Sequence, residues 1–365
     1  MTTMPLAKYD PSQTYRWNYD HAPDAPPVVE VPACPGRWTF CGRSVPSPLG
    51  MPAGPLLNGR WILHYAALGF DVLTYKTVRS RPRACYPLPN LQPVRTESLS
   101  GPRRDVPSCD TMTGDWAVSF GMPSMSPDVW RADVAWTRER LPAEKLLCVS
   151  VVATPEPGWT PAELAADFAQ CARWAVEAGA DSVEANFSCP NVATSDGQLY
   201  QHPEAAAAVA RALREAIGVT PLILKIGHVA DEPAIDQFVT AVGPVIDAFS
   251  MTNCIAATVR LPDGSPLFDG QPRGIAGEAI RAASVTQVRR FAESIRRHDL
   301  TTKLIGVGGA FTAAHVAEYL AAGAESVQIA TAAMLDPAVG LRIRRELATI
   351  NLPEPRPSGS GDGET

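Results

Sequence analysis

The sequence predicts an α/β protein, a (β/α)₈ TIM barrel with an N-terminal arm and a long lid insertion after its second strand. Short apolar runs rich in Val, Ile and Leu alternate eight times with longer amphipathic runs, which is typical of βαβ units around a parallel sheet. Eight such units over about 300 residues favour a closed barrel. A doubly wound sheet is the alternative, but no G-x-G-x-x-G follows the first strand, so the dinucleotide fingerprint of that fold is missing.

The alternating runs predict the barrel elements in order. Strands are expected at residues 50–54, 70–76, 146–152, 182–186, 221–226, 248–252, 303–307 and 326–330. Helices are expected at residues 59–68, 128–140, 161–179, 204–217, 231–242, 278–297, 312–322 and 337–350. Residues 79–127 form a long insertion rich in Pro, Arg and Ser, which we expect to be an irregular lid or binding loop. A second insertion precedes the helix at 278–297.

The chain divides into an arm over residues 1–35, the barrel over residues 36–351 and a tail over residues 352–365. The arm is rich in proline and aromatic residues without a helical period, so we expect it to lie on the barrel, with disorder of its first residues as the alternative. Residues 37–45 alternate in polarity, which predicts a hairpin closing the bottom of the barrel. The composition of the tail predicts disorder.

Composition and charge exclude several classes of protein. A net charge of -6 without a basic cluster argues against nucleic acid as a partner. No apolar run approaches the ~20 residues of a membrane helix, and the N-terminus lacks the order of a signal peptide. The eight cysteines include no C-x-x-C pair and the six histidines no H-E-x-x-H spacing, so we expect no metal and a cytoplasmic protein.

Polar residues and glycines follow the predicted strands. In a (β/α)₈ barrel the active site lies at the carboxyl ends of the strands, so these residues are expected to meet at one mouth. Glycines after the seventh strand let backbone N–H groups approach an anion, and the residues after the eighth strand would complete a phosphate site. The residues at these ends are Ala53, Gly54, Lys76, Thr77, Asn186, Asn191, Lys225, Thr252, Asn253, Cys254, Gly308, Gly309, Ala330 and Thr331.

Lys225 would project from a buried apolar strand of sequence Leu-Ile-Leu-Lys-Ile. A buried ammonium is costly unless it is paired, because desolvation disfavours its charge. A salt bridge to a neighbouring strand is one explanation, for which Glu184 is the only obvious candidate. A ligand that gathers negative charge is the other.

Residues 183–192, of sequence V-E-A-N-F-S-C-P-N-V, read as a buried strand that ends in a polar cluster. The thiol of Cys189, framed by two carboxamides, is a candidate proton-handling group, and the alternative is a buried free cysteine that acts as a small hydrophobe. The stretch resembles the N-x-S-C-P-N motif of the dihydroorotate dehydrogenases. Other segments resemble the same family in the same order, over roughly residues 37–347.

The resemblance implies FMN as the cofactor. Lys225 matches the family lysine at the N1/O2 edge of the flavin, and Lys76 matches the class 1 lysine that contacts flavin and substrate carboxylate. Class 2 members instead carry a lysine where this chain has Leu57. Residues 273–277 resemble a glycine-rich segment that adds a phosphate contact. The cofactor-binding residues implied are Ala53, Gly54, Lys76, Thr77, Asn186, Lys225, Thr252, Gly277, Gly308, Gly309, Ala330 and Thr331.

The resemblance also implies a reaction, the oxidation of dihydroorotate. In the family a hydride leaves ring carbon six for flavin N5 while a base removes a proton from carbon five. Class 1 members use a cysteine base, here Cys189, and class 2 members a serine. A free thiol has a pKa of about 8.5, so the pocket must lower it or the reaction must favour alkaline conditions. The substrate-binding residues implied are Lys76, Phe120, Gly121, Met122, Asn186, Asn191, Asn253 and Cys254.

Three positions or segments depart from the family pattern. Val118 stands where members carry a substrate asparagine, and Cys254 replaces a Ser or Thr. The segment 252–277 is longer than in class 1 and resembles the FMN domain of dihydropyrimidine dehydrogenase, which implies a separate electron-transfer partner or a soluble acceptor. The alternatives are thus an FMN-dependent reductase of a C=C bond in a pyrimidine-like or biosynthetic intermediate and, from another class, an inactive ligand-binding scaffold. A homodimer is carried over from class 1.

Overall fold

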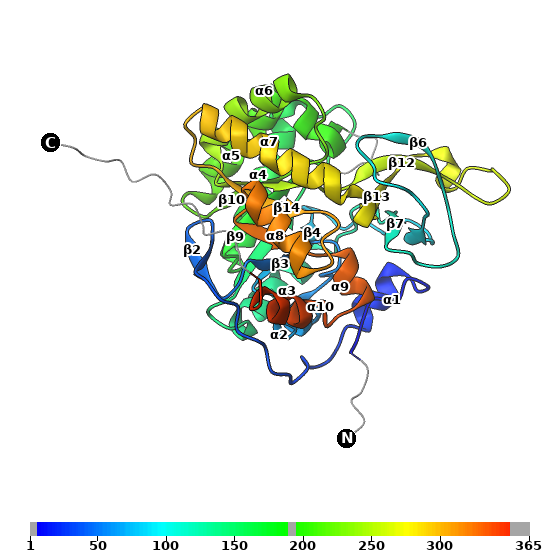
Figure 1. Cartoon of the computed structure of the whole chain (residues 1–365). Coiled ribbons are helices and arrows are strands. Elements are labelled where there is room, and N and C mark those ends of the chain that lie inside the picture. Colours follow the sequence, from blue (N-terminus) through cyan, green and yellow to red (C-terminus); the bar gives the residue numbers. More distant parts are fainter. Residues whose placement is uncertain (1–5, 189–194, 351–365) are drawn as a thin grey trace.

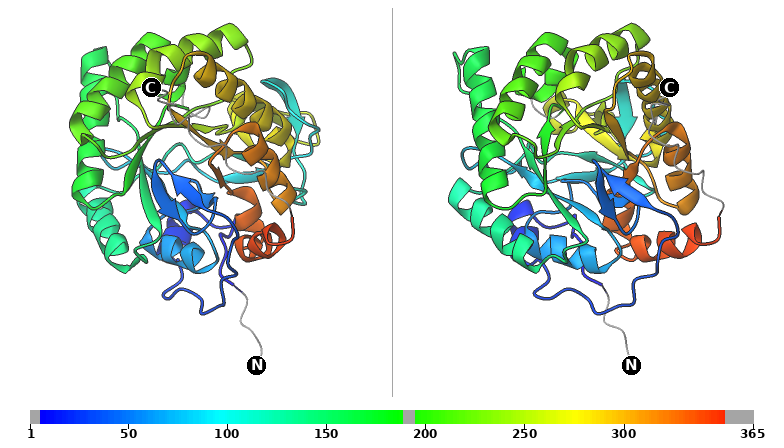
Figure 2. Two further views of the ribbon diagram at one scale, coloured as in Figure 1. Left: turned by 60° about the vertical axis from the view of Figure 1, so that its left-hand side comes forward. Right: turned by 90° about the vertical axis from the view of Figure 1, so that its left-hand side faces the viewer.

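The computed structural model describes residues 6–188 and 195–350, and in them eight parallel strands close into a barrel (Figures 1 and 2). Each strand pairs in parallel with the next along the chain, and the last pairs with the first. The strands are β3 (Leu49–Met51), β4 (Val72–Val78), β8 (Leu146–Val151), β9 (Ser182–Asn186), β10 (Leu222–Lys225), β11 (Ala248–Met251), β14 (Lys303–Val307) and β15 (Ser326–Gln328). The predicted (β/α)₈ barrel is confirmed, and the doubly wound alternative is wrong.

Helices on the outside of the barrel connect these strands. They are α2 (Gly59–Ala67), α3 (Pro127–Arg140), α4 (Pro161–Glu177), α5 (Pro203–Ile217), α6 (Glu232–Val242), α7 (Arg281–Arg297), α8 (Ala313–Ala322) and α10 (Val339–Leu347). Local sequence signals set where they begin: Thr160 and Glu163 form a capping box on α4, and Asp231 and Thr312 cap α6 and α8. In residues 6–188 and 195–350 none of the helices is long and apolar enough to cross a membrane.

Two short helices are absent from the sequence prediction. α1 (Tyr15–Asp20) lies in the arm, and α9 (Thr331–Leu335) follows β15. The last helix, α10, begins at Val339 instead of the expected residue 337. Neither α1 nor α9 has enough turns to display a helical period in the sequence. Short 3₁₀ helices also occur, namely η1 (Ser195–Gln201), η2 (Gly243–Val245), η3 (Phe268–Gly270) and η4 (Glu278–Ile280).

The two insertions together build a second sheet, so the expectation of an irregular loop over residues 79–127 is wrong. The first insertion supplies β5 (Leu91–Pro93), β6 (Arg103–Pro107) and β7 (Asp115–Val118), and the second supplies β12 (Ile255–Arg260) and β13 (Arg273–Gly277). The order of this five-stranded sheet, which we call the lid sheet, is β5-β7-β13-β12-β6. It has its own apolar core and lies to one side of the barrel in Figure 1.

The N-terminal arm packs against the barrel beside the lid sheet. The indole N–H of Trp61 donates to the carbonyl of Asn18 at 3.0 Å, and the amide of Asn58 donates to the carbonyl of Tyr19 at 2.8 Å. Tyr15 packs edge-on against Phe120, with ring centroids 6.0 Å apart. The arm therefore supports a residue predicted to bind substrate. The first five residues of the arm and residues 351–365, which include the predicted disordered tail, lie outside the described residues.

A hairpin closes the bottom of the barrel, as the sequence predicts. It consists of β1 (Trp38–Phe40) and β2 (Arg43–Val45), paired antiparallel. Phe40 packs into an apolar cluster with inward-facing strand residues of the barrel. The carboxylate of Glu325, just before β15, accepts the backbone N–H of Cys41 in the hairpin turn at 2.7 Å.

Replacing Glu325 with glutamine is expected to change how stability depends on pH. Burial raises the pKa of Glu325 to about 7, from 4.5. Because the folded state holds this proton more tightly than the unfolded chain, stability falls as pH rises between those two values. We expect the wild type to gain about 2 kcal/mol relative to E325Q between pH 8 and pH 5. Urea unfolding at both pH values measures this, and a pH-independent difference would contradict it.

Candidate active site

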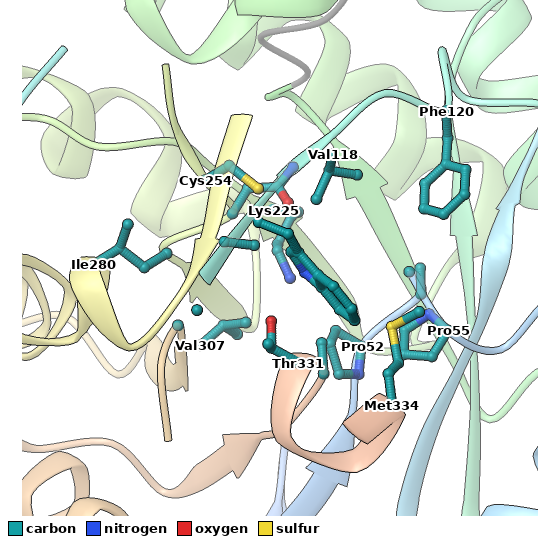
Figure 3. A pocket seen from close by; sticks show the side chains of 18 of the residues that line it. Pro52, Pro55, Val118, Phe120, Lys225, Cys254, Ile280, Val307, Thr331 and Met334 are labelled. Carbon is teal, nitrogen blue, oxygen red and sulfur yellow. The ribbon is translucent and has the colours of Figure 1, made fainter. Parts of the chain in front are cut away.

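A pocket opens at the carboxyl ends of the barrel strands, under the lid sheet (Figure 3). Its lining includes most of the residues that the sequence predicts for substrate and cofactor. These are Ala53, Gly54, Lys76, Thr77, Phe120, Gly121, Met122, Asn186, Lys225, Asn253, Cys254, Gly277, Gly308, Gly309, Ala330 and Thr331. Residues at or after seven of the eight barrel strands, distant in sequence, therefore meet in one cavity, as the strand-end rule predicts.

Three predicted residues are not part of that lining. Thr252 is fully buried, and its backbone N–H donates to the carbonyl of Val307 at 2.6 Å. Its side chain is not part of the pocket lining, and its role as a cofactor-binding residue stays a prediction. Cys189 and Asn191 lie outside the described residues.

Lys76 lies in the second half of β4, and its side chain is on the lid side of the pocket. It is 7 % exposed, and its ammonium lies 5.3 Å from the ring centroid of Phe120. A cation over an aromatic face is stabilised by the ring quadrupole. Tyr9 and Tyr15 hold Phe120 from behind through edge-on contacts. The arm, the lid insertion and β4 thus combine to fix one buried positive charge.

Two asparagines fix the backbone that leads into the cysteine motif. Asn186 ends β9, and its side-chain oxygen accepts the N–H of Ser188 at 3.1 Å. The side-chain amide of Asn253, which follows β11, donates to the carbonyl of Ser188. Asn186 also places its amide 3.6 Å from the sulfur of Met122. Both carboxamides therefore hold Ser188, the last described residue before Cys189, from two sides.

Lys225 reaches the floor of the pocket from β10. It is 4 % exposed, and in the described part of the chain its ammonium has no hydrogen bond or ion pair. Glu184 lines the same floor from β9, yet the two side chains do not form the salt bridge that was one explanation of the buried lysine. The ammonium is therefore available to a ligand, which is the other explanation.

The opposite end of the pocket is built from glycines. Gly309 has φ +69°, and a Cβ on it would lie 2.5 Å from the carbonyl of Gly277. A Cβ on Gly308, at φ +120°, would lie 2.7 Å from the hydroxyl of Ser284. Only glycine fits such positions, and the loops after β13 and β14 touch there. Within residues 6–188 and 195–350, no backbone hydrogen bond outside the regular elements engages the N–H groups of Gly308 and Gly309.

These features fit a ligand of the FMN type. An anionic group suits the glycine end, where no side chains on Gly308 and Gly309 keep a ligand from the backbone N–H groups. A ring that gathers negative charge suits the unpartnered Lys225 at the floor. Apolar walls between the two ends suit a flat aromatic body. Among the described residues, no three potential metal ligands gather in one place.

Several lining residues escape the sequence analysis. The lid insertion supplies Val118, which the sequence does not predict as a binding residue, and Phe120, which it does (Figure 3). The lid wall also includes Leu91 of β5 and Trp116 of β7, and the other unpredicted lining residues are Pro52, Pro55, Glu184, Ala276, Ile280, Val307, Ala310, Phe311 and Met334. Period-2 alternation within residues 91–93 and 115–118 is too short to be a signal, so no local pattern reveals this wall.

Comparison with known proteins agrees with this geometry. The sequence model described as dihydroorotate dehydrogenase matches residues 37–350. A dihydroorotate dehydrogenase of Dictyostelium discoideum is 31 % identical over 320 residues, which cover 83 % of this chain and 86 % of the relative. A dihydroorotate dehydrogenase A (fumarate) of Lacticaseibacillus paracasei is 32 % identical over 170 residues, 46 % of this chain and 56 % of the relative.

A further relative covers a similar part of the chain. The catalytic subunit of dihydroorotate dehydrogenase B (NAD(+)) of Bacillus pumilus is 30 % identical over 171 residues, 46 % of this chain and 53 % of the relative. Among solved structures, dihydroorotate dehydrogenase of Eimeria tenella in complex with ferulenol has a TM-score of 0.72 at 16 % identity, covering 92 % of this chain and 89 % of that one, a likeness that shows the fold. The family model spans most of the chain, and the chain belongs to the dihydroorotate dehydrogenase family.

Proposed function

We propose that the chain is an FMN-dependent oxidoreductase that oxidises dihydroorotate, or a related cyclic amide, with Cys189 as the base. The observation that carries the proposal is the convergence of Lys76, Asn186, Lys225 and the glycine end in one pocket of a family member. Bound FMN would supply the hydride acceptor. Its phosphate would lie at the glycine end and its ring over Lys225, whose ammonium would stabilise the negative charge of the reduced ring.

The remaining steps belong to side chains of this chain. The ammonium of Lys76 would pair with the substrate carboxylate, because a buried cation that lines the pocket favours an anionic ligand. Asn186 and Asn253 hold Ser188 and would thereby aim Cys189 at the ring carbon that loses its proton. The thiolate would take that proton as general base. The lid sheet would exclude water from the site.

An anaerobic titration with dihydroorotate tests the proposal. Absorbance of the oxidised flavin in the purified protein is followed as substrate is added. We expect bleaching in proportion to substrate. A yellow protein that dihydroorotate does not bleach would point to a different substrate, and a colourless protein would favour an inactive scaffold.

A second candidate function keeps the flavin and reverses the reaction. Val118 occupies the lid wall together with Leu91 and Trp116, so this wall offers fewer polar groups than the barrel side. A substrate with an apolar edge would suit it, because a polar edge that faces this wall would lose hydrogen bonds to water and gain fewer in return. A reductase would oxidise chemically reduced flavin when a uracil or an enone is added. Turnover of these compounds without oxidation of dihydroorotate would replace the first candidate.

The electron acceptor, assembly and location extend the proposal. The relatives' names include fumarate and NAD(+), which supports a soluble acceptor or a separate electron-transfer partner for this chain. A homodimer in the cytoplasm completes the proposal. Reoxidation of the substrate-reduced protein by fumarate or by NAD⁺, and a mass measurement in solution, would test these points separately.

A further inference from the structure

Glu184 is a buried carboxylate that the chemistry above does not use. It is 1 % exposed, it lines the pocket floor, and its Oε2 atom is fully shielded without a hydrogen-bond partner in the described residues. Other buried acids in the barrel are paired. Asp71, which is fully buried, accepts the ammonium of Lys145 at 2.5 Å and the guanidinium of Arg344 at 2.7 Å. The buried carboxylate of Asp71 thus has two cationic partners, whereas no ion pair of Glu184 is found among the described residues.

Lys225 is a positive charge close to Glu184. In the barrel register Glu184 stands between Ser150 of β8 and Ile223 of β10, and Lys225 is the next inward residue along β10. The thiol of Cys148 lies within the field of both groups: burial raises its pKa most, the charge of Glu184 raises it further, and the charge of Lys225 lowers it. Glu184 and Lys225 are thus close enough to act on one atom, yet they share no direct contact.

An unpaired opposite charge beside Lys225 has a definite electrostatic effect. The interaction of two charges inside a protein is several times stronger than in water and falls slowly with distance. An anion near Lys225 offsets part of the positive potential that this ammonium projects into the pocket. A ligand that becomes more negative on reduction would therefore be stabilised less by Lys225 and Glu184 together than by Lys225 alone.

We propose that Glu184 is a positioning residue that sets the reduction potential of the flavin by balancing the charge of Lys225. The inference rests on the proposed function, because it assumes that FMN occupies this pocket. Glu184 does not exchange a proton or a hydride with the substrate in this proposal. Its charge keeps the bound flavin a weaker oxidant than Lys225 alone would make it.

The test is the midpoint potential of the bound flavin in E184Q, measured anaerobically against a reference dye. Glutamine keeps the size of the side chain and removes its charge. We expect the ratio of the affinities for reduced and oxidised flavin to rise at least tenfold, which is about 30 mV for a two-electron couple. The dissociation constant of oxidised FMN is measured on the same variant. E325Q is the matched control, since it neutralises a buried glutamate at the other end of the barrel, and its potential should equal that of the wild type.

A double-mutant cycle that removes both charges protects the test against an indirect effect of one substitution. K225Q should lower the potential, and the double variant E184Q/K225Q, which has no charge at either position, should return toward the wild-type value. A yellow wild type whose potential is the same in E184Q and E325Q would overturn the role of Glu184. A wild-type protein that does not bind FMN would overturn the proposed function instead.

Discussion

Replacing Lys76 with alanine is expected to lower kcat/KM for dihydroorotate by about 10²- to 10³-fold. Lys76 is the buried cation on the lid side of the pocket, 7 % exposed and 5.3 Å from the ring of Phe120. Without it a substrate carboxylate would enter the pocket unpaired, and losing one partner of a buried charge pair costs about 2–5 kcal/mol. Steady-state assays with an artificial acceptor dye measure the change. The flavin spectrum should be retained.

The matched control for Lys76 is a lysine of another barrel strand. Lys303 begins β14 at the end of the barrel opposite to the pocket and is half-buried. K303A should keep kcat/KM within about twofold, since surface substitutions rarely exceed ±0.5 kcal/mol. An unchanged kcat/KM in K76A would show that the substrate carboxylate does not meet this side chain.

The barrel could be predicted because its signal is local. Each strand is a short apolar run and each helix an amphipathic one, so the alternation is visible without knowing what pairs with what. Strand bounds shifted by up to three residues, as with β3 at Leu49–Met51 against the expected 50–54. The strand-end rule then brought Lys76, Asn186 and Lys225 together correctly, because the closed barrel fixes where parallel strands finish.

The lid sheet could not be predicted because its pairing is long-range. Val118 of β7 pairs with Gly274 of β13, and each strand supplies only a few residues to the sheet. Glycines and prolines in these strands also lower their strand propensity. Packing between the two insertions overrides this local preference. The pocket wall made by Leu91 and Trp116 depends on that packing, which is why the sequence did not show it.

The electrostatics of the pocket floor also exceed what a sequence reveals. The sequence offered Glu184 as a salt-bridge partner for Lys225, because it was the only obvious acid on a neighbouring predicted strand. The register places Glu184 opposite Ile223 and Lys225 opposite Asn186. Glu184 and Lys225 are therefore two positions apart in the register, and in the described residues neither charge has a direct partner. Only the register, and not the residue types, distinguishes the two arrangements.

Replacing Cys189 with alanine is expected to leave FMN bound and to slow the reduction of flavin by dihydroorotate about 10²-fold or more, as for loss of a general base. Rapid-mixing absorbance under anaerobic conditions measures the rate. The reason lies in the residues before it. Asn186 and Asn253 both bond to the backbone of Ser188, which is 2 % exposed. Two carboxamides that bond to the N–H and to the carbonyl of Ser188 indicate that the direction of the following residue matters.

Cys254 offers the matched control, because it is a second thiol that lines the same pocket. C254A loses a residue predicted to bind substrate but keeps the base, so it should slow flavin reduction less than C189A and retain the pH profile of the wild type. If C189A kept the wild-type rate and C254A lost it, the base would be the thiol after β11 instead of the thiol in the N-x-S-C-P-N motif. Equal losses in both variants would mean that the pocket needs its shape more than either proton acceptor. The pH profile separates these cases, because only loss of the true base removes the rise in rate with pH that titration of the thiol produces.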